Sequence, residues 1–588
     1  MMFAPATSPD PNADIRNVIM MIPDGCGDAH TTLARWYSSG PLALDSMPSG
    51  MIRTYGADSI ISDSAPAATA FATGHKTSDK YVGVLPGTVT VPGVEVPSSD
   101  LMYSPVASLV EAAKAKGMSV GLVATANIQH ATPAGFSAHW PDRGNYNVIA
   151  EQQVYMDLDV VFGGGSQYLL PISEGGKRTD GENLVNVLIT RGYLYIDDRN
   201  ELMSLDPENV EKVWGLFAPD AMAKDFDRSL PMNNGQPSLS EMTSKAIDIL
   251  SRNPKGFFLM VEGSQVDWSS HANDPVGVVS ETLAFDAAVK VALDFAKRDR
   301  HTMLLAFTDH GNGGMSIGNG YTDSTYSKLP LTKMLTPALM SAKVTGSGLY
   351  YLLPNDPTEQ QVRDTVAAYY GITDLTVEEV QAIKAARAGP NNMDYVIGPM
   401  MSKRCSIGWT TTGHTGEDVT LYSYGPQRPI GLFENVEIAK LTAAALHLDL
   451  GKATKNLFID ANATFVSMGA TVRFDVSDPA NPVLVVEKPG LKTMRLHYHK
   501  DVITIDGKDI ILNGVIIASP KVQKVWVPMD AVLLFQGKAK TSSQQGQTSI
   551  PLWYLGMDAE SMGERSFTPL SAAFVVSGSV IVAMMTKW

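Results

Sequence analysis

The sequence predicts an α/β protein with a mostly parallel central sheet sandwiched between helices, followed by a smaller β-rich domain. Short apolar runs that end abruptly in polar or glycine residues recur through the first 425 positions, and helical patterns separate them. Beyond Gly451 the pattern changes to strands and turns. A chain of 588 residues also exceeds the usual limit for a single core, so at least two compact units are expected.

Six apolar runs predict buried strands with both faces covered, at residues 18–22, 120–124, 158–162, 257–261, 303–308 and 419–424. Between them, Ser104-Pro105 predicts the start of a helix that Gly117 ends. A longer helix is expected after Pro275, where apolar residues recur at helical spacing, and another at 436–448. This alternation predicts a sheet whose strands are mostly parallel.

Side chains that can bind metal ions follow several of these strands directly. Asp24, Glu262, Asp309 and His310 all occupy such positions. In an open α/β sheet the binding site forms beyond the carboxyl ends of the strands, so these four residues indicate a metal site at one edge of the sheet.

The trailing part of the chain predicts short strands at 457–459, 471–474, 483–487 and 502–505, with an Asp506-Gly507 turn after the last. The Gln- and Ser-rich stretch 536–548 predicts an exposed loop. Residues 571–585 are too few to cross a bilayer and suit a buried strand better, so no transmembrane segment is expected. We therefore expect one domain at 15–450 and a β-rich accessory domain of unknown role at 451–588.

The charge and cysteine content exclude some classes of protein. A formal net charge of -15 argues against a surface that binds nucleic acid or an anionic membrane. It would also repel a phosphate group unless bound metal ions reverse the field locally. Two cysteines, Cys26 and Cys405, are too few for a disulfide framework, and their pairing stays open. Because the N-terminal residues show no basic region followed by a long apolar one, we expect that any secretion signal has been removed.

Ser64 stands at the predicted start of an alanine-rich helix that ends at Gly74. Backbone N–H groups and the helix dipole stabilise an anion there, which suits a nucleophile that becomes phosphorylated. The alternative is that Asp63 or Ser64 merely caps the helix.

Further candidates for metal binding lie later in the chain. Asp267 and His271 are four residues apart, so one helical turn would present both to the same ion. Asp309-His310 follows a strand, and His414 lies among small residues that allow close approach to the backbone.

In this order, these segments resemble the alkaline phosphatases. The matching pieces are Pro23-Asp24-Gly25, Asp63-Ser64-Ala65, His130-Ala131-Thr132-Pro133-Ala134, Glu262 to His271, Asp309-His310-Gly311 and His414-Thr415-Gly416. The resemblance spans roughly residues 15 to 450. It implies the α/β/α fold of that family and hydrolysis of small phosphate monoesters through a phosphoserine on Ser64.

The resemblance also implies three metal ions. Asp267, His271 and His414 would hold one zinc ion, and Asp24, Asp309 and His310, with Ser64, would hold a second. Asp24 would bridge to a third ion, usually magnesium, bound by Thr132 and Glu262. Ligand sets with nitrogen favour zinc, and all-oxygen sets favour magnesium. A homodimer and a periplasmic or secreted location are implied as well.

Arg143 matches the phosphate-binding arginine of the family, with a surface salt bridge as its alternative. His130 and Trp268 depart from the best-known bacterial member, which has Asp and Lys there, and they would lie near the phosphate and the third ion. We favour His130 as a hydrogen-bonding neighbour of that ion's ligands rather than as a ligand. Cys26 is expected to be structural.

Three other classes of protein fit the sequence less well. A sulfatase would need an arginine after Ser64-Ala65-Pro66 that this chain lacks. A diesterase of the same superfamily generally lacks the third metal site and an equivalent of Arg143. A non-catalytic surface-binding module would use its metals only structurally. Structural zinc sites are closed by four protein ligands, whereas the resemblance implies an open two-zinc arrangement beside Ser64.

Overall fold

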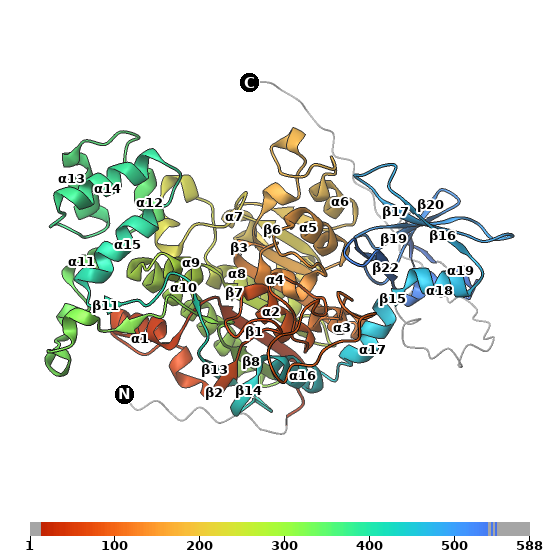
Figure 1. Ribbon diagram of the computed structural model, residues 1–588, viewed down its shortest axis with the longest axis horizontal. Helices are drawn as coiled ribbons and strands as arrows, with labels where there is room; N and C mark the ends of the chain where they lie inside the picture. The colour runs from red at the N-terminus through yellow and green to blue at the C-terminus, as the bar shows by residue number, and fades with distance from the viewer. Residues whose placement is uncertain (1–12, 539–541, 545–546, 550–588) are drawn as a thin grey trace.

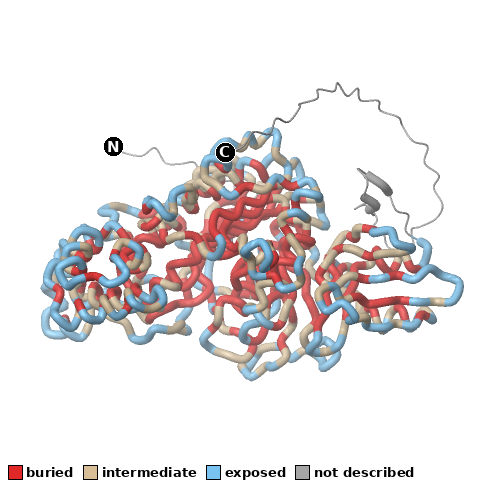
Figure 2. The backbone as a smooth tube through the Cα atoms, turned by 90° about the horizontal axis from the view of Figure 1, so that it is seen from above, coloured by how far each residue is buried: buried red, intermediate tan, exposed pale blue. Residues whose placement is uncertain are grey.

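The computed structural model describes residues 13–538, 542–544 and 547–549. A ten-stranded sheet forms the centre of the molecule, and helices cover both of its faces (Figure 1). A group of helices lies at one end of this central unit, and the C-terminal β region lies at the other. Buried residues concentrate along the central strands (Figure 2).

The strands of the central sheet follow the order β14-β2-β13-β8-β1-β7-β3-β4-β6-β5. Their bounds are β1 Asn17–Pro23, β2 Pro48–Arg53, β3 Ser119–Asn127, β4 Val160–Gly164, β5 Leu194–Ile196, β6 Val213–Leu216, β7 Phe257–Gly263, β8 Thr302–Ala306, β13 Val419–Tyr424 and β14 Gly431–Glu434. Every neighbouring pair is parallel except β13 with β2 and with β8. The prediction of a mostly parallel sheet between helices is confirmed.

Alternate side chains of β1 enter two different cores, as the pleat of a strand requires. Val18, Met20 and Ile22 pack on one face, and Ile19 and Met21 pack on the other. The first face is covered by α2 Ser64–Thr73, α3 Leu109–Lys116, α4 Ala131–Ser137, α5 Tyr146–Tyr155, α6 Leu184–Thr190 and α16 Asn435–Ala445. The second is covered by α1 Asp28–Ser38, α7 Arg199–Ser204, α8 Leu239–Leu250 and α10 Pro275–Asp299.

A helical insert packs against the start of α10. It comprises α11 Pro337–Ser341, α12 Gly346–Leu352, α13 Glu359–Tyr369, α14 Val377–Ala388 and α15 Met393–Arg404, which share a core with Val276, Val278 and Val279. The Tyr370 hydroxyl donates to Asp274 Oδ1 at 2.6 Å, and Lys224 Nζ lies 2.9 Å from Asp394 Oδ2. These polar contacts fix the insert to the segment that follows α9, Gln265–His271, and to Lys224, which lies before α8 in the chain.

The C-terminal region is built on an antiparallel sheet. Its elements are α17 Leu450–Leu457, β15 Ile459–Asp460, α18 Ala461–Ser467, β16 Thr471–Asp475, β17 Val483–Glu487, β18 Met494–His497, β19 Val502–Ile505, β20 Lys508–Ile511, β21 Ile517–Ser519, β22 Lys524–Val527, α19 Met529–Phe535, β23 Ser542–Gln544 and β24 Gln547–Ser549. Most of its apolar residues form their own core around Phe465. Val515, Ile517 and Trp526 instead join the core of the central unit, so the two parts pack against each other.

Several element predictions need correction. The helix expected from Ser104-Pro105 begins at Leu109, because Ser108 and Glu111 form the capping box four residues further on. The run 419–424 is a strand, but its burial alternates and it lies antiparallel, so only one of its faces is covered. The strand expected at 457–459 is shorter and shifted, because Leu457 ends α17 and only Ile459 lies in a strand, β15.

Two further predictions concern the end of the chain. The stretch expected to be an exposed loop, 536–548, instead contains β23 and the first two residues of β24. The strand expected at 571–585 lies outside the described residues. Within the described part of the chain, the search for a helix both long and apolar enough to traverse a membrane finds none.

Candidate active site

The predicted metal-binding residues gather at the carboxyl edge of the central sheet. Asp24 directly follows β1, Glu262 lies near the end of β7, and Asp309 and His310 follow β8. All four side chains are fully buried. Isolated carboxylates are costly to bury, so this arrangement calls for cations in the same place.

The first cluster joins α9 to the short strand β12, His414–Thr415. Ligand atoms of Asp267, His271 and His414 all lie within 4.8 Å of one another. The Nδ1 atoms of His271 and His414 lie 2.6 and 2.9 Å from the carbonyl oxygens of Thr412 and Ser62. Because a carbonyl only accepts, each Nδ1 carries the proton, and in the neutral rings both Nε2 lone pairs are free.

Those two Nε2 atoms lie 3.2 Å apart and close to the Asp267 carboxylate. Burial acts to raise the pKa of Asp267, but its hydrogen bond to His271 and the nearby histidines lower it overall. Against the opposing effect of burial, the same contact with Asp267 raises the pKa of His271. In their neutral form with the proton on Nδ1, the two imidazoles would offer Nε2 beside the Asp267 carboxylate, which is a suitable donor set for zinc.

The second cluster comprises Asp24, Asp309 and His310, all buried. Burial, reinforced by the Asp309 charge, raises the pKa of Asp24 well above its usual value. Asp309 Oδ2 has no hydrogen-bond partner within the described residues. Ser64 Oγ lies 3.2 Å from both Asp24 Oδ2 and His310 Nε2, so the serine hydroxyl adjoins this cluster.

Ser64 is the first residue of α2, where the predicted helix begins. Asp63 precedes it in extended conformation, but its side chain makes no capping hydrogen bond. Arg143 Nη1 donates to Asp63 Oδ1 at 2.6 Å instead. Within the described residues the capping alternative therefore finds no support for Asp63, and the free N–H groups of α2 remain near Ser64.

A third group surrounds Glu262. Asp24, His130 and Glu262 offer ligand atoms within 4.8 Å of one another. Both Glu262 oxygens and Thr132 Oγ1 are buried without a hydrogen-bond partner among the described residues. Burial raises the pKa of Glu262 to about 8. Such orphaned oxygen atoms fit a magnesium-type ion, which takes oxygen ligands.

His130 lies beside this third group. Burial lowers its pKa to about 3, so the ring is neutral. Its Nε2 lies 3.0 Å from Arg143 Nη2, which can only donate, so this nitrogen acts as the acceptor. That hydrogen bond favours a supporting role for His130, which stays a prediction. The Trp268 ring meets the His130 ring edge-to-face at 5.7 Å.

Arg143 lies between α4 and α5, close to Ser64 in space. Asp63 and His130 hold its guanidinium on two sides, and the Arg143 N–H donates to the Lys80 carbonyl at 2.8 Å. Arg143 does form a salt bridge, with Asp63, but at 19% exposure its side chain lies mostly below the surface, and its binding of phosphate stays a prediction. All the predicted site residues thus meet in one region.

Asn312 was not predicted as a site residue. Its Nδ2 donates to Asp267 Oδ1 at 2.6 Å and to the Asp267 carbonyl at 3.0 Å. It belongs to β9, Gly311–Asn312, where it pairs directly with His414. Its position two residues after His310 was the available signal, but its partner is 45 residues away in the sequence.

A cavity of about 300 Å³ opens beside His414. It is lined by Gly56, Asp58, Ser59, Ile61, Ser62, Asp63, Pro66 and Asp79 as well as His414. This space adjoins α2, which begins at Ser64, and its volume is sufficient for part of a small molecule.

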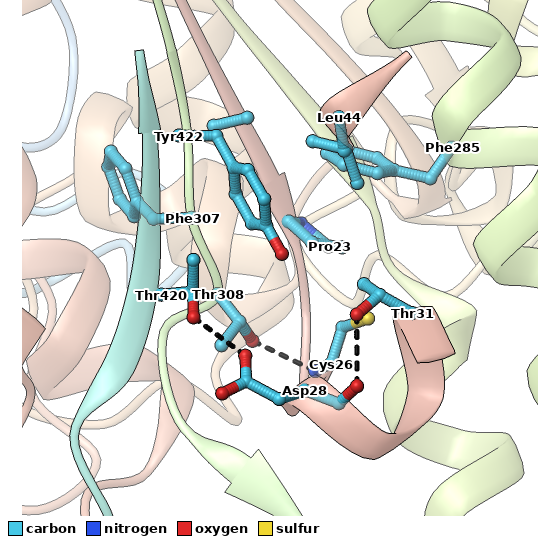
Figure 3. Close-up of a pocket in the computed structure, with 11 residues that line it drawn as sticks. Pro23, Cys26, Asp28, Thr31, Leu44, Phe285, Phe307, Thr308, Thr420 and Tyr422 are labelled. Carbon is cyan, nitrogen blue, oxygen red and sulfur yellow. Dashed lines mark hydrogen bonds between the residues drawn. The ribbon is translucent and has the colours of Figure 1, made fainter. Parts of the chain in front are cut away.

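Cys26 belongs to none of the three candidate ligand groups found in the described part of the chain. Its side chain borders a cavity of about 10 Å³ together with Thr31 and Tyr422, and its N–H donates to Thr308 Oγ1 at 2.9 Å (Figure 3). That volume holds at most about one water molecule. Burial raises the pKa of the Cys26 thiol to about 12. Cys26 and Cys405 are both buried and unpaired, which answers the open question of a disulfide.

Comparisons with known proteins agree with this geometry. A family profile described as alkaline phosphatase matches residues 15–448. Alkaline phosphatase 3 of Bacillus subtilis is 36% identical over 460 residues, which cover 74% of this chain and 90% of that protein.

Solved structures give the same result. The cold-active alkaline phosphatase of the psychrophile Shewanella sp. superposes with a TM-score of 0.61 at 30% identity, covering 73% of this chain and 99% of that one. A histidine-to-aspartate mutant of the alkaline phosphatase from the Antarctic bacterium TAB5, with Mg bound in its M3 site, gives a TM-score of 0.51 at 26% identity. It covers 74% of this chain and 99% of that one.

Proposed function

The chain belongs to the alkaline phosphatase family of phosphomonoester hydrolases, and from that premise we propose that it acts through a phosphoserine on Ser64 with two zinc ions and one magnesium ion. The observation that carries this proposal is the position of Ser64 Oγ, 3.2 Å from both Asp24 and His310 at the start of a buried helix. Hydroxyls in such a position serve as nucleophiles.

Three donor sets would hold the ions. Asp267, His271 and His414 would hold one zinc ion, and Asp24, Asp309, His310 and Ser64 the other. Asp24, Thr132 and Glu262 would hold magnesium, since their oxygen atoms are buried there and Glu262 and Thr132 lack other partners among the described residues. When bound, these ions lower the pKa of an attached hydroxyl or water and neutralise charge on the phosphoryl group.

The residues of the chain divide the remaining work. In the first step a bond forms between Ser64 Oγ and phosphorus while the bond to the alcohol oxygen breaks, and the alcohol leaves. In the second step water attacks phosphorus, the bond to Ser64 breaks, and inorganic phosphate is released. Arg143, held by Asp63 and His130, would offer two N–H donors to the nonbridging oxygens of the phosphate.

Other parts of the proposal concern the whole protein. The substrates are proposed to be small phosphate monoesters, whose alcohol portion would occupy the cavity beside His414. We further propose a catalytic domain at 15–450 with an accessory domain at 451–588, a homodimer, and a periplasmic or secreted location.

The proposal is tested by hydrolysis of p-nitrophenyl phosphate at alkaline pH, in parallel with the bis(p-nitrophenyl) diester. Ser64→Ala is expected to lower kcat/KM on the order of 10³-fold or more, and Ser204→Ala, a helical serine of α7 outside the site, is the matched control. Chelation should abolish activity, and zinc plus magnesium should restore it. Acid quenching with ³²P-labelled substrate should trap label on wild type but not on Ser64→Ala.

Other outcomes would redirect the proposal. Preference for the diester would favour a phosphodiesterase of the same superfamily. If neither substrate were turned over, a non-catalytic binding role would replace it. Full activity of Ser64→Ala would show that Ser64 is misassigned.

A further inference from the structure

Three consecutive residues of the C-terminal region bind the central unit. His499, Lys500 and Asp501 lie in the connection between β18 and β19. Lys500 Nζ lies 2.9 Å from Glu182, and Asp501 forms a two-pronged ion pair with Arg191 at 2.5 and 2.9 Å. Asp501 is only 2% exposed. Since buried bidentate pairs of this kind are geometrically specific, the connection between β18 and β19 has a fixed position against the central unit.

His499 reaches the polypeptide that leads to Arg143. Gln152, on α5, is fully buried, and its side-chain amide forms three hydrogen bonds. Its Oε1 accepts from the His139 N–H at 2.7 Å, while its Nε2 lies 3.2 Å from the His139 carbonyl and 3.1 Å from His499 Nδ1. Burial lowers the pKa of His499 to about 3, so its neutral ring can accept this hydrogen bond.

The same imidazole supports the next residue, Trp140. The rings of Trp140 and His499 meet edge-to-face at 5.2 Å. On its other side, the Trp140 backbone forms a two-way bridge with Val82, at 2.9 Å in each direction. Residues 139–143 are therefore held between the segment at 80–84 and His499, and Arg143 is the end of this short stretch.

The backbone at His499 is unusual. Its φ of 62° lies in the left-handed region, which residues other than glycine adopt rarely. The surrounding contacts, including the His499 N–H to the Ile516 carbonyl at 2.8 Å, must maintain this conformation. Strained residues of this kind are concentrated at positions where orientation matters.

We infer that His499 is a positioning residue for Arg143, so that the C-terminal β region helps to set the affinity of the active site for phosphate. The inference rests on the proposed role of Arg143 in binding phosphate. The C-terminal region would then contribute to phosphate binding without touching the substrate, by holding the segment that carries Arg143. His499 orients His139 through Gln152 and Trp140 through ring contact, and the fixed loop aims the Arg143 guanidinium.

The test is a double-mutant cycle in the full-length protein, with the inhibition constant for inorganic phosphate and the KM for p-nitrophenyl phosphate as readouts. His499→Ala should raise both by about 3- to 10-fold, corresponding to the loss of one buried hydrogen bond and a ring contact. In an Arg143→Ala background the same change should have no further effect, because the group being positioned is gone. Metal content should be unchanged.

Two further variants sharpen the result. His499→Asn keeps an acceptor and tolerates the left-handed backbone, so it should recover part of the phosphate affinity and serves if His499→Ala fails to fold. His497→Ala, whose imidazole bonds Thr504 within the C-terminal sheet, is the matched control and should leave the inhibition constant unchanged.

The outcomes separate the inference from the proposed function. Equal effects of His499→Ala with and without Arg143, or no effect on phosphate inhibition, would overturn the inference alone. If Arg143→Ala itself left phosphate inhibition unchanged, the proposed role of Arg143 would fail, and the inference with it.

Discussion

Backbone carbonyls determine which nitrogen each active-site histidine presents. His271, His414 and His310 place Nδ1 against the carbonyls of Thr412, Ser62 and Gly311. The Nε2 atoms therefore face inward, two of them with Asp267 and the third with Ser64. Residues that orient a metal ligand in this way tune its affinity as well as its direction.

Asn312 should act in the same way on Asp267. Asn312→Leu removes both hydrogen bonds to Asp267 while keeping a similar volume. The Asp267 carboxylate would then lose its fixed orientation, and zinc affinity should fall by about 10- to 100-fold. Competition with a calibrated chelator measures this change. Asn253→Leu, which loses three hydrogen bonds outside the site, is the control, and unchanged zinc affinity of Asn312→Leu would refute the assignment.

Two helices that carry active-site residues pack together at a glycine. α2 carries Ser64, and α4 carries Thr132. A Cβ added at Gly135 would lie 2.8 Å from Ala68 Cβ and 3.0 Å from the Thr69 nitrogen. The small residues of α2 and Gly135 thus allow an approach that fixes the distance between Ser64 and Thr132.

Gly135→Ala should separate these helices. The clash is with Ala68 Cβ and the α2 backbone, which cannot move aside as the end of a flexible side chain could, so we expect a loss of about 1–3 kcal/mol in the free energy of unfolding. Magnesium stimulation of activity should weaken at the same time, because Thr132 moves with α4. Denaturant titration and metal-dependent assays measure the two effects. Gly40→Ala, where an added Cβ meets nothing within 4 Å, is the control, and equal stability of the two variants would contradict the prediction.

At this scale the sequence predicted some features better than others. The strands near Asp24, Glu262 and Asp309 were predicted because continuous apolar runs mark strands covered on both faces. The start of α3 was missed because Ser104-Pro105 and Ser108 are both plausible caps, and only the reciprocal bond with Glu111 distinguishes them. The direction of β13 depends on its pairing partners, which periodicity does not reveal.

The site shows a similar division. Its candidate ligands could be chosen from residue type, position after strands and resemblance. Their supporting contacts could not, since Ser62 and His414 are 352 residues apart and Gln152 and His499 are 347 apart. Contacts of such long range arise from the tertiary fold, which also places the C-terminal region beside residues 139–143.

At the scale of the whole molecule, several buried carboxylates of this acidic protein cluster in the active site. Asp24, Glu262, Asp267 and Asp309 lie together, and Arg143 is the cation next to them. The chain as a whole carries a net charge of -15, so its overall field opposes a phosphate dianion. Bound cations would both relieve the repulsion among the carboxylates and attract the substrate.

This arrangement makes stability depend jointly on pH and on metal. The pKa of Glu262 is raised from 4.5 to about 8, and that of Asp24 is also raised. A raised pKa means that the folded state holds the proton more tightly than the unfolded state. The contribution is fully present below about pH 4.5 and is lost as pH rises to about 8. Chelated protein should therefore lose unfolding free energy over this range, by at most roughly 5 kcal/mol for Glu262.

Metal-loaded protein should not show this loss, because bound cations stabilise the ionised carboxylates. Other buried acids with raised pKa values, such as Glu151 and Glu281 at about 7, titrate in both forms. The difference between the loaded and chelated proteins, measured by urea unfolding at pH 5.5 and 8, consequently isolates the metal centre. Glu262→Gln, neutral at both pH values, should reduce that difference. If the difference in unfolding free energy between the loaded and chelated wild type were the same at pH 5.5 and pH 8, the assignment of Glu262 as a cation ligand would be contradicted.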